Sequence, residues 1–147
     1  MRNSKRWMLV LLVITGLLLP ACGANSESTT SDAKPASVEP IAGTDLRKVI
    51  LTADAAKRVD IQTAPARNEQ VNGAQHEVIP YDAVLYDAEG NTWAYTNPEP
   101  LTYVRHHITV DTIDGDRAIL SEGPPVGMAV VTVGAAILYG AEFEFEE

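Results

Sequence analysis

A long run of alternating side chains, TYVRHHITVDT at residues 102–112, sets the fold class that this sequence predicts. The even-numbered positions from 104 to 110 would project from one side of an extended strand, and the odd-numbered positions from 103 to 111 from the other. Asp114 and Gly115 follow as a strong signal for a type I′ hairpin, which returns the chain into RAILS at residues 117–121. The pattern therefore predicts a long antiparallel β-strand.

Other short β segments surround this strand. AVLYD at residues 83–87 and TWAYT at residues 92–96 are expected to pair through the turn AEGN, with Trp93 and Tyr95 on one face. AVVTV at residues 129–133 has the composition of a buried strand, and the GAAILYG that follows is expected to form a short turn or helical piece.

The C-terminal letters EFEFEE also alternate strictly, which predicts an end strand with Phe143 and Phe145 on the core face. The glutamates would then face water; they are Glu142, Glu144, Glu146 and Glu147. The polar segment RNEQVNGAQ at residues 67–75 is expected to be a loop. NPEP at residues 97–100 is expected to be another, because its prolines prevent further pairing.

The first folded element is KVILTADAAKRVDIQTAPAR, which begins at residue 48. VIL is expected to form a strand, Thr52 can cap a short helix over residues 53–58, and Asp54 lies where the helix dipole favours an anion. DIQTAP then returns to extended structure. Together the segments predict a mainly β domain over residues 46–147, a small antiparallel β-roll or barrel-like sheet with one short helix.

The N-terminal segment has the order of a secretory signal. Three basic residues within the first six positions are followed by an apolar run from residue 7 to residue 19 and then by small residues. This run is shorter than the roughly 20 residues that a membrane-spanning helix needs. Residues 1–21 are therefore expected to be a signal peptide that is removed on export.

The only cysteine, Cys22, follows directly in LLLPACG. The letters LPAC resemble the lipobox of bacterial lipoproteins, in which a peptidase cleaves before the cysteine and its sulfur carries a diacylglycerol. A thiol is the natural nucleophile for that alkylation. The alternative is an ordinary secreted protein whose cysteine lies near the cut by chance. Cys22 is expected to be the lipidation site, and a single cysteine excludes a disulfide within the chain.

Cleavage after residue 21 takes three of the 11 basic residues and none of the 20 acidic residues, which leaves a formal net charge of −12 with histidine neutral. Such an acidic chain repels phosphate backbones, so no nucleic-acid partner is expected. Residues 22–45 are poor in large aliphatic side chains and are expected to form a disordered tether after the lipidated cysteine. The domain would stand on the extracytoplasmic side of a bacterial membrane, inner or outer.

Histidines and aspartates are the candidate metal ligands in this sequence. His106 and His107 are adjacent, but neighbours on a strand project to opposite faces and cannot chelate one ion without distortion. His76 is a third candidate, in a predicted loop. The aspartates near the hairpin lack the glycine and terminal glutamate of a calcium loop; they are Asp111, Asp114 and Asp116. No metal and no cofactor is expected.

The sequence also lacks catalytic motifs. Ser121 in LSEG lacks the glycine pattern of a nucleophile elbow, and no phosphate-binding glycine loop or histidine-glutamate metal motif occurs. An enzyme is not expected. Trp93, Tyr95 and Tyr103 could line a ligand groove, but alternating strand positions favour core or cross-strand aromatic pairs.

Two segments resemble the periplasmic adaptor subunits, or membrane fusion proteins, of resistance-nodulation-division (RND) type efflux pumps. Residues 78–142 resemble their C-terminal, membrane-proximal region in the order AVLYD, TWAYT, VRHHITV, GDRAIL and GMAVVTVGAAILYG. The earlier VILTADAAKRVDIQTAPA resembles a segment near the start of those adaptors. In the family a lipoyl-like domain, a long helical hairpin and a β-barrel separate the two segments, whereas residues 67–76 do so here. EGPPVG also replaces the more usual glycine-leucine stretch.

The resemblance implies a membrane-proximal domain that stands alone on a lipid anchor and docks on an inner-membrane efflux transporter or a related membrane complex. Without a heptad pattern, a bridge to a second membrane is not implied. The residues expected to dock are Arg105, Asp114, Gly115, Asp116, Glu122 and Gly127. The alternative is a stand-alone extracytoplasmic lipoprotein that binds a metal or a small hydrophobic molecule, with the strand of Trp93 and Tyr95 as its platform.

Overall fold

The structure, a computed structural model, describes residues 34–144. Within this range β-strands predominate and every strand pair is antiparallel, as the sequence predicts. In chain order the elements are β1 (Ala36–Pro40), β2 (Arg47–Leu51), α1 (Ala53–Val59), β3 (Gln62–Pro65), β4 (Arg67–Val71), β5 (Ala74–Pro80), a 3-10 turn η1 (Tyr81–Ala83), β6 (Leu85–Tyr86), β7 (Thr92–Glu99), β8 (Thr102–His107), β9 (Thr109–Asp114), β10 (Arg117–Glu122), β11 (Ala129–Val133) and α2 (Ala135–Glu144).

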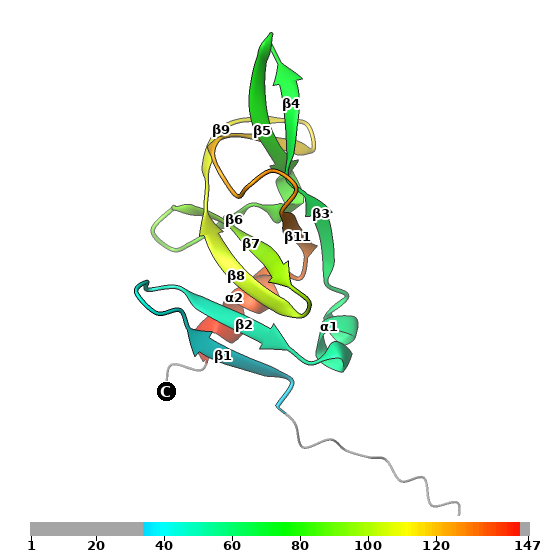
Figure 1. Cartoon of the computed structure of the whole chain (residues 1–147), viewed down its shortest axis with the longest axis vertical. Helices are drawn as coiled ribbons and strands as arrows, with labels where there is room; N and C mark the ends of the chain where they lie inside the picture. Colours follow the sequence, from blue (N-terminus) through cyan, green and yellow to red (C-terminus); the bar gives the residue numbers. More distant parts are fainter. Residues whose placement is uncertain (1–33, 145–147) are drawn as a thin grey trace, which may run out of the picture. The chain divides into compact units, whose positions relative to one another are not determined.

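The strands form two sheets (Figure 1). The larger has the order β1-β2-β8-β7-β11-β3, with β6 paired to β7, and the smaller has the order β4-β5-β10-β9. In the larger sheet, strands from the start of the domain pair with strands from its end. Val49 of β2 lies opposite Tyr103 of β8, and Ala64 of β3 lies opposite Val130 of β11. Pairing between distant segments therefore closes the domain.

Two buried clusters form the core. The first packs α1 and α2 against the larger sheet and includes Val49, Tyr103 and Leu138. The second lies where the two sheets meet and includes Ile79, Ile108, Leu120, Val130 and the buried Ala66 between β3 and β4. The chain passes directly from one sheet to the other at Ala66, between β3 and β4, and at Ile108, between β8 and β9, and both residues are buried there.

Residues 102–112 form two strands in different sheets, so the prediction of one long strand is wrong. β8 ends at His107 in the larger sheet, and β9 begins at Thr109 in the smaller one. Ile108 between them is buried, and its backbone N–H donates to the Thr92 carbonyl oxygen at 3.0 Å. Before this corner the buried residues are Tyr103 and Arg105, at odd-numbered positions, whereas at the corner the buried residue is Ile108, at an even-numbered position. The alternation of the sequence continues through the bend, so it does not show that the chain changes sheet.

Several local predictions are confirmed. The order strand, short helix, strand is found in β2, α1 and β3, and the Thr52 hydroxyl oxygen accepts the Ala55 N–H at 3.2 Å. β6 and β7 pair with Leu85 opposite Trp93, although residues 83–87 contribute only the two-residue β6 after η1. NPEP is only partly a loop, because β7 runs on to Glu99.

The boundary between the predicted tether and the domain lies earlier than expected. Residues 36–40, placed in the tether, form β1, which pairs with β2 from Ala36 opposite Leu51 to Pro40 opposite Arg47. Ala36 is buried in the first core. A strand at a sheet edge satisfies its backbone through the ladder, so few large aliphatics are needed. Residues 22–33 lie outside the described range.

The segment at residues 67–75 is a β-hairpin, and its prediction as a loop is wrong. β4 and β5 pair around Asn72 and Gly73, whose φ angles of +51° and +86° fit a type I′ turn. Asn-Gly is itself a strong hairpin signal, which the polar flanking residues obscured. The hairpin after β9 is confirmed, but its turn residues are Gly115 and Asp116. Of these only Gly115 has a positive φ, which fits type II′.

The C-terminal end strand is not present among the described residues; a second helix, α2, continues to Glu144. Two of the expected exposures are reversed, because Glu142 is 1 % exposed and Phe143 is 39 % exposed, whereas Glu144 is exposed as predicted. Helical spacing places Ala135, Leu138 and Glu142 on one buried side, three and four residues apart. Gly134 turns the chain into the helix with a φ of +92°. Phe145, Glu146 and Glu147 lie outside the described range.

Candidate functional site

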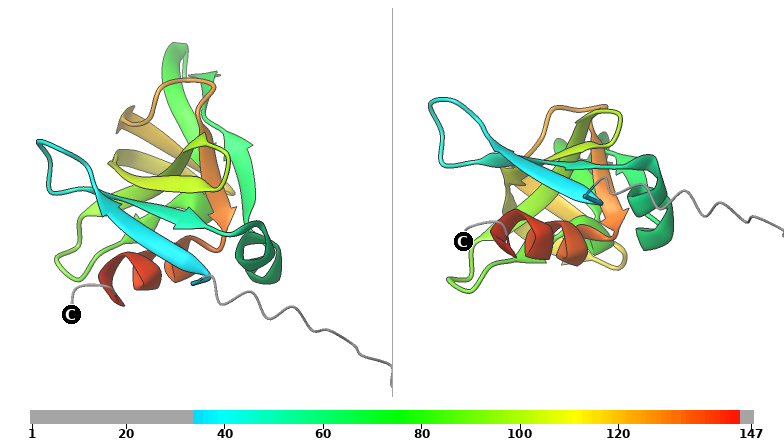
Figure 2. Two further views of the ribbon diagram at one scale, coloured as in Figure 1. Left: turned by 60° about the horizontal axis from the view of Figure 1, so that its bottom comes forward. Right: turned by 90° about the horizontal axis from the view of Figure 1, so that it is seen from below.

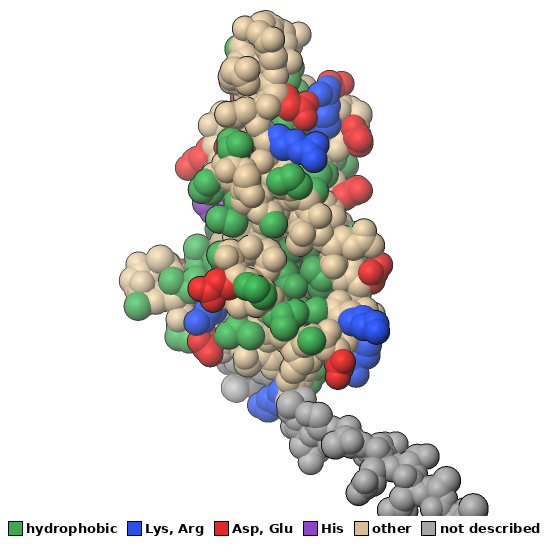
Figure 3. All heavy atoms as spheres, turned by 45° about the vertical axis from the view of Figure 1, so that its right-hand side comes forward, with side chains coloured by type: hydrophobic (Ala, Val, Ile, Leu, Met, Phe, Trp, Pro, Cys, Tyr) green, Lys and Arg blue, Asp and Glu red, His purple; other side chains and the backbone are tan. Residues whose placement is uncertain are grey.

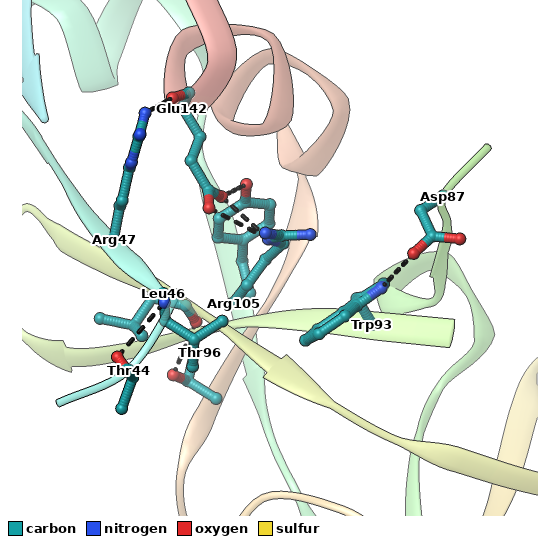
Figure 4. A network of polar contacts seen from close by, with 10 residues as sticks. Thr44, Leu46, Arg47, Asp87, Trp93, Thr96, Arg105 and Glu142 are labelled. Carbon is teal, nitrogen blue, oxygen red and sulfur yellow. Dashed lines mark hydrogen bonds and ion pairs between the residues drawn. The ribbon is translucent and has the colours of Figure 1, made fainter. Parts of the chain in front are cut away.

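The most organised polar site in the described part of the chain lies beneath helix α2 (Figure 4). Glu142 points from α2 toward the larger sheet, where its Oε1 accepts a hydrogen bond from the Arg105 Nε at 3.1 Å. The Tyr95 hydroxyl donates to the Glu142 Oε2. Tyr95 on β7 and Arg105 on β8 are direct cross-strand partners. The sheet register therefore presents both donors to one carboxylate.

Aromatic rings surround the Arg105 guanidinium, and the residue as a whole is only 9 % exposed. The guanidinium carbon lies 4.5 Å from the Trp93 ring centroid, 5.1 Å from that of Phe143 and 5.7 Å from that of Tyr139. Such geometry is favourable for cation–π contacts. We call this set the Glu142 cluster; it consists of Trp93, Tyr95, Arg105, Tyr139, Glu142 and Phe143.

The cluster fixes the protonation of its tyrosine. Burial, and then the hydrogen bond to the Glu142 carboxylate, raise the pKa of the Tyr95 hydroxyl far above its ordinary value, so it remains a donor. Arg47 of β2 adds a weaker contact, with its Nη1 3.5 Å from the Glu142 carbonyl oxygen. The Glu142 carboxylate is thus paired with Arg105 and Tyr95 inside the domain. The role that this arrangement supports is structural: it holds α2 on the larger sheet.

Asp87 holds the Trp93 ring in place. Its carboxylate accepts the Trp93 indole N–H at 2.9 Å, the Asn91 side-chain amide at 2.9 Å and the Asn91 backbone N–H at 2.7 Å. These hydrogen bonds, the Asn91 side chain first and Trp93 second, lower the pKa of Asp87 to about 2. The AEGN turn thus orients the ring that covers Arg105.

The outer side of α2 is also apolar. Its exposed positions are Ala136, Ile137, Phe143 and Glu144, with Gly140 half-buried between them. Ile137 is 55 % exposed and Phe143 is 39 % exposed, which places both among the exposed large hydrophobic residues of the described chain. A surface helix of a globular domain usually carries polar residues on its outer side. We call this surface the outer face of α2 and define it as Ala136, Ile137, Gly140 and Phe143.

The structure does not gather the residues expected to dock. Arg105 is buried in the Glu142 cluster, so its place among the exposed docking residues is corrected. The residues at the turn between β9 and β10 are exposed; they are Asp114, Gly115 and Asp116. Glu122, opposite Thr109, lies at the other end of that hairpin, and the exposed Gly127 follows in the next loop.

Arg117 pairs with two carboxylates near the β9–β10 turn. Its Nη1 lies 2.7 Å from a carboxylate oxygen of Glu69, and its Nη2 pairs with Asp114. On the face drawn in Figure 3, most Lys and Arg side chains likewise lie beside Asp or Glu. That face therefore carries no extended patch of one sign.

The histidines do not converge on one point. His107 is exposed and meets the Trp93 ring edge-on, with centroids 5.2 Å apart, whereas His106 is half-buried and precedes it on the same strand. His76 lies on β5. Within residues 34–144 no three His, Cys, Asp or Glu side chains come together as a metal site would require.

The aromatic residues that could form a ligand platform are largely internal. Tyr95 and Tyr103 are buried in the first core, as the core interpretation predicted, and Trp93 covers Arg105. Shallow grooves occur elsewhere. One of about 200 Å³ lies beside Arg67 and Arg117, and one of about 410 Å³ lies beside Tyr86 and His107.

Sequence reasoning missed Glu142, because the alternation of EFEFEE predicts that its side chain faces water. The signal that would have found it is the helical spacing of Ala135, Leu138 and Glu142 through GAAILYGAE. Comparison of the chain with models of protein families, with curated proteins and with solved structures finds no match. Neither helix of the described region has the length and apolar character needed to cross a bilayer.

Proposed function

We propose that this protein is a lipid-anchored, extracytoplasmic, adaptor-like accessory protein that docks on an efflux transporter or a related membrane complex. The observation that carries the proposal is the pairing of β2 with β8 and of β3 with β11. These strands come from the two segments that resemble the beginning and the end of efflux adaptors. Their closure into one sheet supports a membrane-proximal domain that needs no inserted domains to fold.

The position of the β4–β5 hairpin agrees with this proposal. In the adaptors the long insertion lies between the two segments, and here the hairpin takes its place. It projects at the end of the described domain opposite to β1 and β2 (Figure 1). A short hairpin at that end replaces an insertion without disturbing the pairing of the larger sheet.

The N-terminal sequence supplies the membrane attachment in this proposal. Ala36, the first residue of β1, follows Cys22 by fourteen residues. A chain of that length reaches at most about 50 Å when fully extended. A diacylglyceryl group on Cys22 would therefore keep the β1 end of the domain close to the bilayer, within reach of the extracytoplasmic part of a membrane protein.

Purification from native membranes tests the proposal. A peptide tag inserted at the Asn72–Gly73 turn leaves β1 and α2 unmodified, and the tagged full-length chain is isolated in mild detergent. An efflux transporter, or a related integral membrane complex, is expected to copurify and to be identified by mass spectrometry. The matched Cys22→Ser chain is expected in the soluble extracytoplasmic fraction without that partner. Recovery of the lipidated chain with no integral membrane protein contradicts the proposal.

A further inference from the structure

We infer that the outer face of α2 is the surface with which this protein contacts its membrane partner, and that it fits an apolar patch on the extracytoplasmic part of an integral membrane protein. The inference rests on the proposed function and deepens it, because it assigns the docking surface. It also replaces the β9–β10 turn, which is expected from the sequence to dock, as the proposed contact surface.

The first argument is the composition of the helix. α2 buries Ala135, Leu138 and Glu142 against the sheet, so its outer face should be the polar one. Instead, the outer positions carry one charged side chain among the described residues, Glu144 at the end of the helix. An exposed apolar helix face is typical of a contact surface.

Gly140 lies in the middle of this face. A glycine inside a helix costs about 1 kcal/mol relative to alanine. A Cβ added at Gly140 would meet no atom within 4 Å, so nothing in the described domain requires glycine here. An external surface that packs closely on the helix supplies a reason, since the missing side chain lets the backbones approach.

The position of α2 gives the second argument. The helix lies beside β1, as both views in Figure 2 show, and Leu138 shares the first core with Ala36. Ala36 is the residue that the chain reaches fourteen positions after Cys22. The anchor therefore restricts the outer face of α2 to the neighbourhood of the bilayer, while the Asn72–Gly73 turn lies at the far end of the domain (Figure 1).

Charge favours a protein partner over the lipid surface. Helices that lie on membranes usually carry Lys or Arg on the flanks of the apolar face, and residues 135–144 contain neither. The mature chain, with a formal net charge of −12, is repelled by anionic headgroups. The same charge opposes face-to-face packing of two copies. A protein patch that is apolar at its centre and basic at its rim complements the outer face of α2 and Glu144.

Site-specific photocrosslinking in native membranes tests this assignment with the full-length lipidated chain. A photoreactive amino acid is placed at position 137 or 140 on the outer face of α2, or at position 115 or 72 on the two hairpin turns. Adducts with an integral membrane protein, identified by mass spectrometry, are expected from positions 137 and 140 only. Adducts confined to lipid, to a second copy of the chain, or to positions 115 and 72 overturn the inference.

A pair of variants adds a quantitative readout. Ile137→Asp is expected to reduce the copurified membrane partner by about tenfold or more. Ile113→Asp is the matched control, because Ile113 on β9 is 41 % exposed, and it is expected to leave the recovery unchanged. Circular dichroism establishes that both variants fold. Equal recovery with both variants contradicts the inference but leaves the proposed function standing, whereas no partner with the unmodified chain contradicts the proposed function itself.

Discussion

Glu142 on α2 and Arg105 on β8 form a buried ion pair, with the Arg105 Nε 3.0 Å from the Glu142 Oε2 and 3.1 Å from its Oε1. The two residues are 37 positions apart in the sequence. Both side chains are almost removed from water, and Tyr95 donates a further hydrogen bond. The pair joins the last helix of the described domain to the central strands of the larger sheet.

Removal of the cation from this pair is expected to destabilise the fold strongly. Arg105→Met leaves the Glu142 carboxylate buried without its charge partner, which typically costs about 3–5 kcal/mol. Lys48→Met is the matched control, because Lys48 and Glu39 form an exposed pair at 2.8 Å, and the loss of an exposed pair has little effect on stability. Urea unfolding monitored by circular dichroism measures both. Similar costs for the two variants would show that the buried pair does not hold α2.

The hydroxyl of Tyr95 is expected to contribute separately. Tyr95→Phe removes a donor from a buried carboxylate and should lower the free energy of unfolding by about 1–3 kcal/mol. Tyr103→Phe is the control, since Tyr103 is buried in the same core but the hydroxyl that donates to Glu142 is that of Tyr95. A Tyr95→Phe chain as stable as the unmodified one would contradict the assigned hydrogen bond.

Alkaline pH should reveal the raised pKa of Tyr95. A group whose pKa is raised on folding stabilises the fold below its unfolded pKa, about 10 for tyrosine, and this contribution is lost as the pH rises above that value. The free energy of unfolding is therefore expected to fall above about pH 10, and to fall less steeply in Tyr95→Phe. Urea titrations between pH 8 and pH 11 measure the slopes. Equal slopes would refute the burial of this hydroxyl.

Acidic pH should act through Asp87. Its pKa is lowered to about 2 in the folded chain, against about 3.9 unfolded, so its contribution is present above about pH 4 and is lost as the pH falls toward 2. Asp87→Asn is expected to flatten the loss of stability in this window. Asp111→Asn, at an exposed position on β9, serves as the control. The prediction fails if both variants retain the acid sensitivity of the unmodified chain.

Glu77 offers a stabilising substitution. Its Oε1 is buried without a hydrogen-bond partner among the described residues, and burial raises the pKa of its carboxyl. Ionisation at neutral pH is therefore unfavourable in the fold, and stability is expected to fall as the pH rises through the folded pKa. Glu77→Gln should unfold at a higher urea concentration at pH 7, with a smaller advantage at pH 4. Glu122→Gln, at an exposed position, should change neither value. A destabilised Glu77→Gln chain would mean that the carboxylate is needed.

The sequence predicted those elements whose capping or turn residues lie within or next to them. Thr52 and Asp54 marked the start of α1, and the turn residues after β6 and β9 marked two hairpins. Turn and cap chemistry acts within a few residues, so a linear reading captures it. The Asn-Gly signal between β4 and β5 was equally local, and only its polar context led to a loop being expected there.

The buried polar site did not follow from the sequence, and neither did the arrangement of the sheets. Alternation through residues 102–112 predicted extended chain, but a change of sheet at Ile108 decides which side is buried. In the sequence, Glu142 has the pattern of a surface glutamate. In the structure, helix α2 directs it toward Arg105 and Tyr95, and the positions of these two residues depend on the pairing of β7 with β8. Whether a residue is buried depends on which distant segment of the chain packs against it, and a local sequence pattern does not specify that segment. The sequence determined strands, turns and the start of α1, whereas tertiary pairing alone decided which charged side chains are buried and which face of α2 remains exposed.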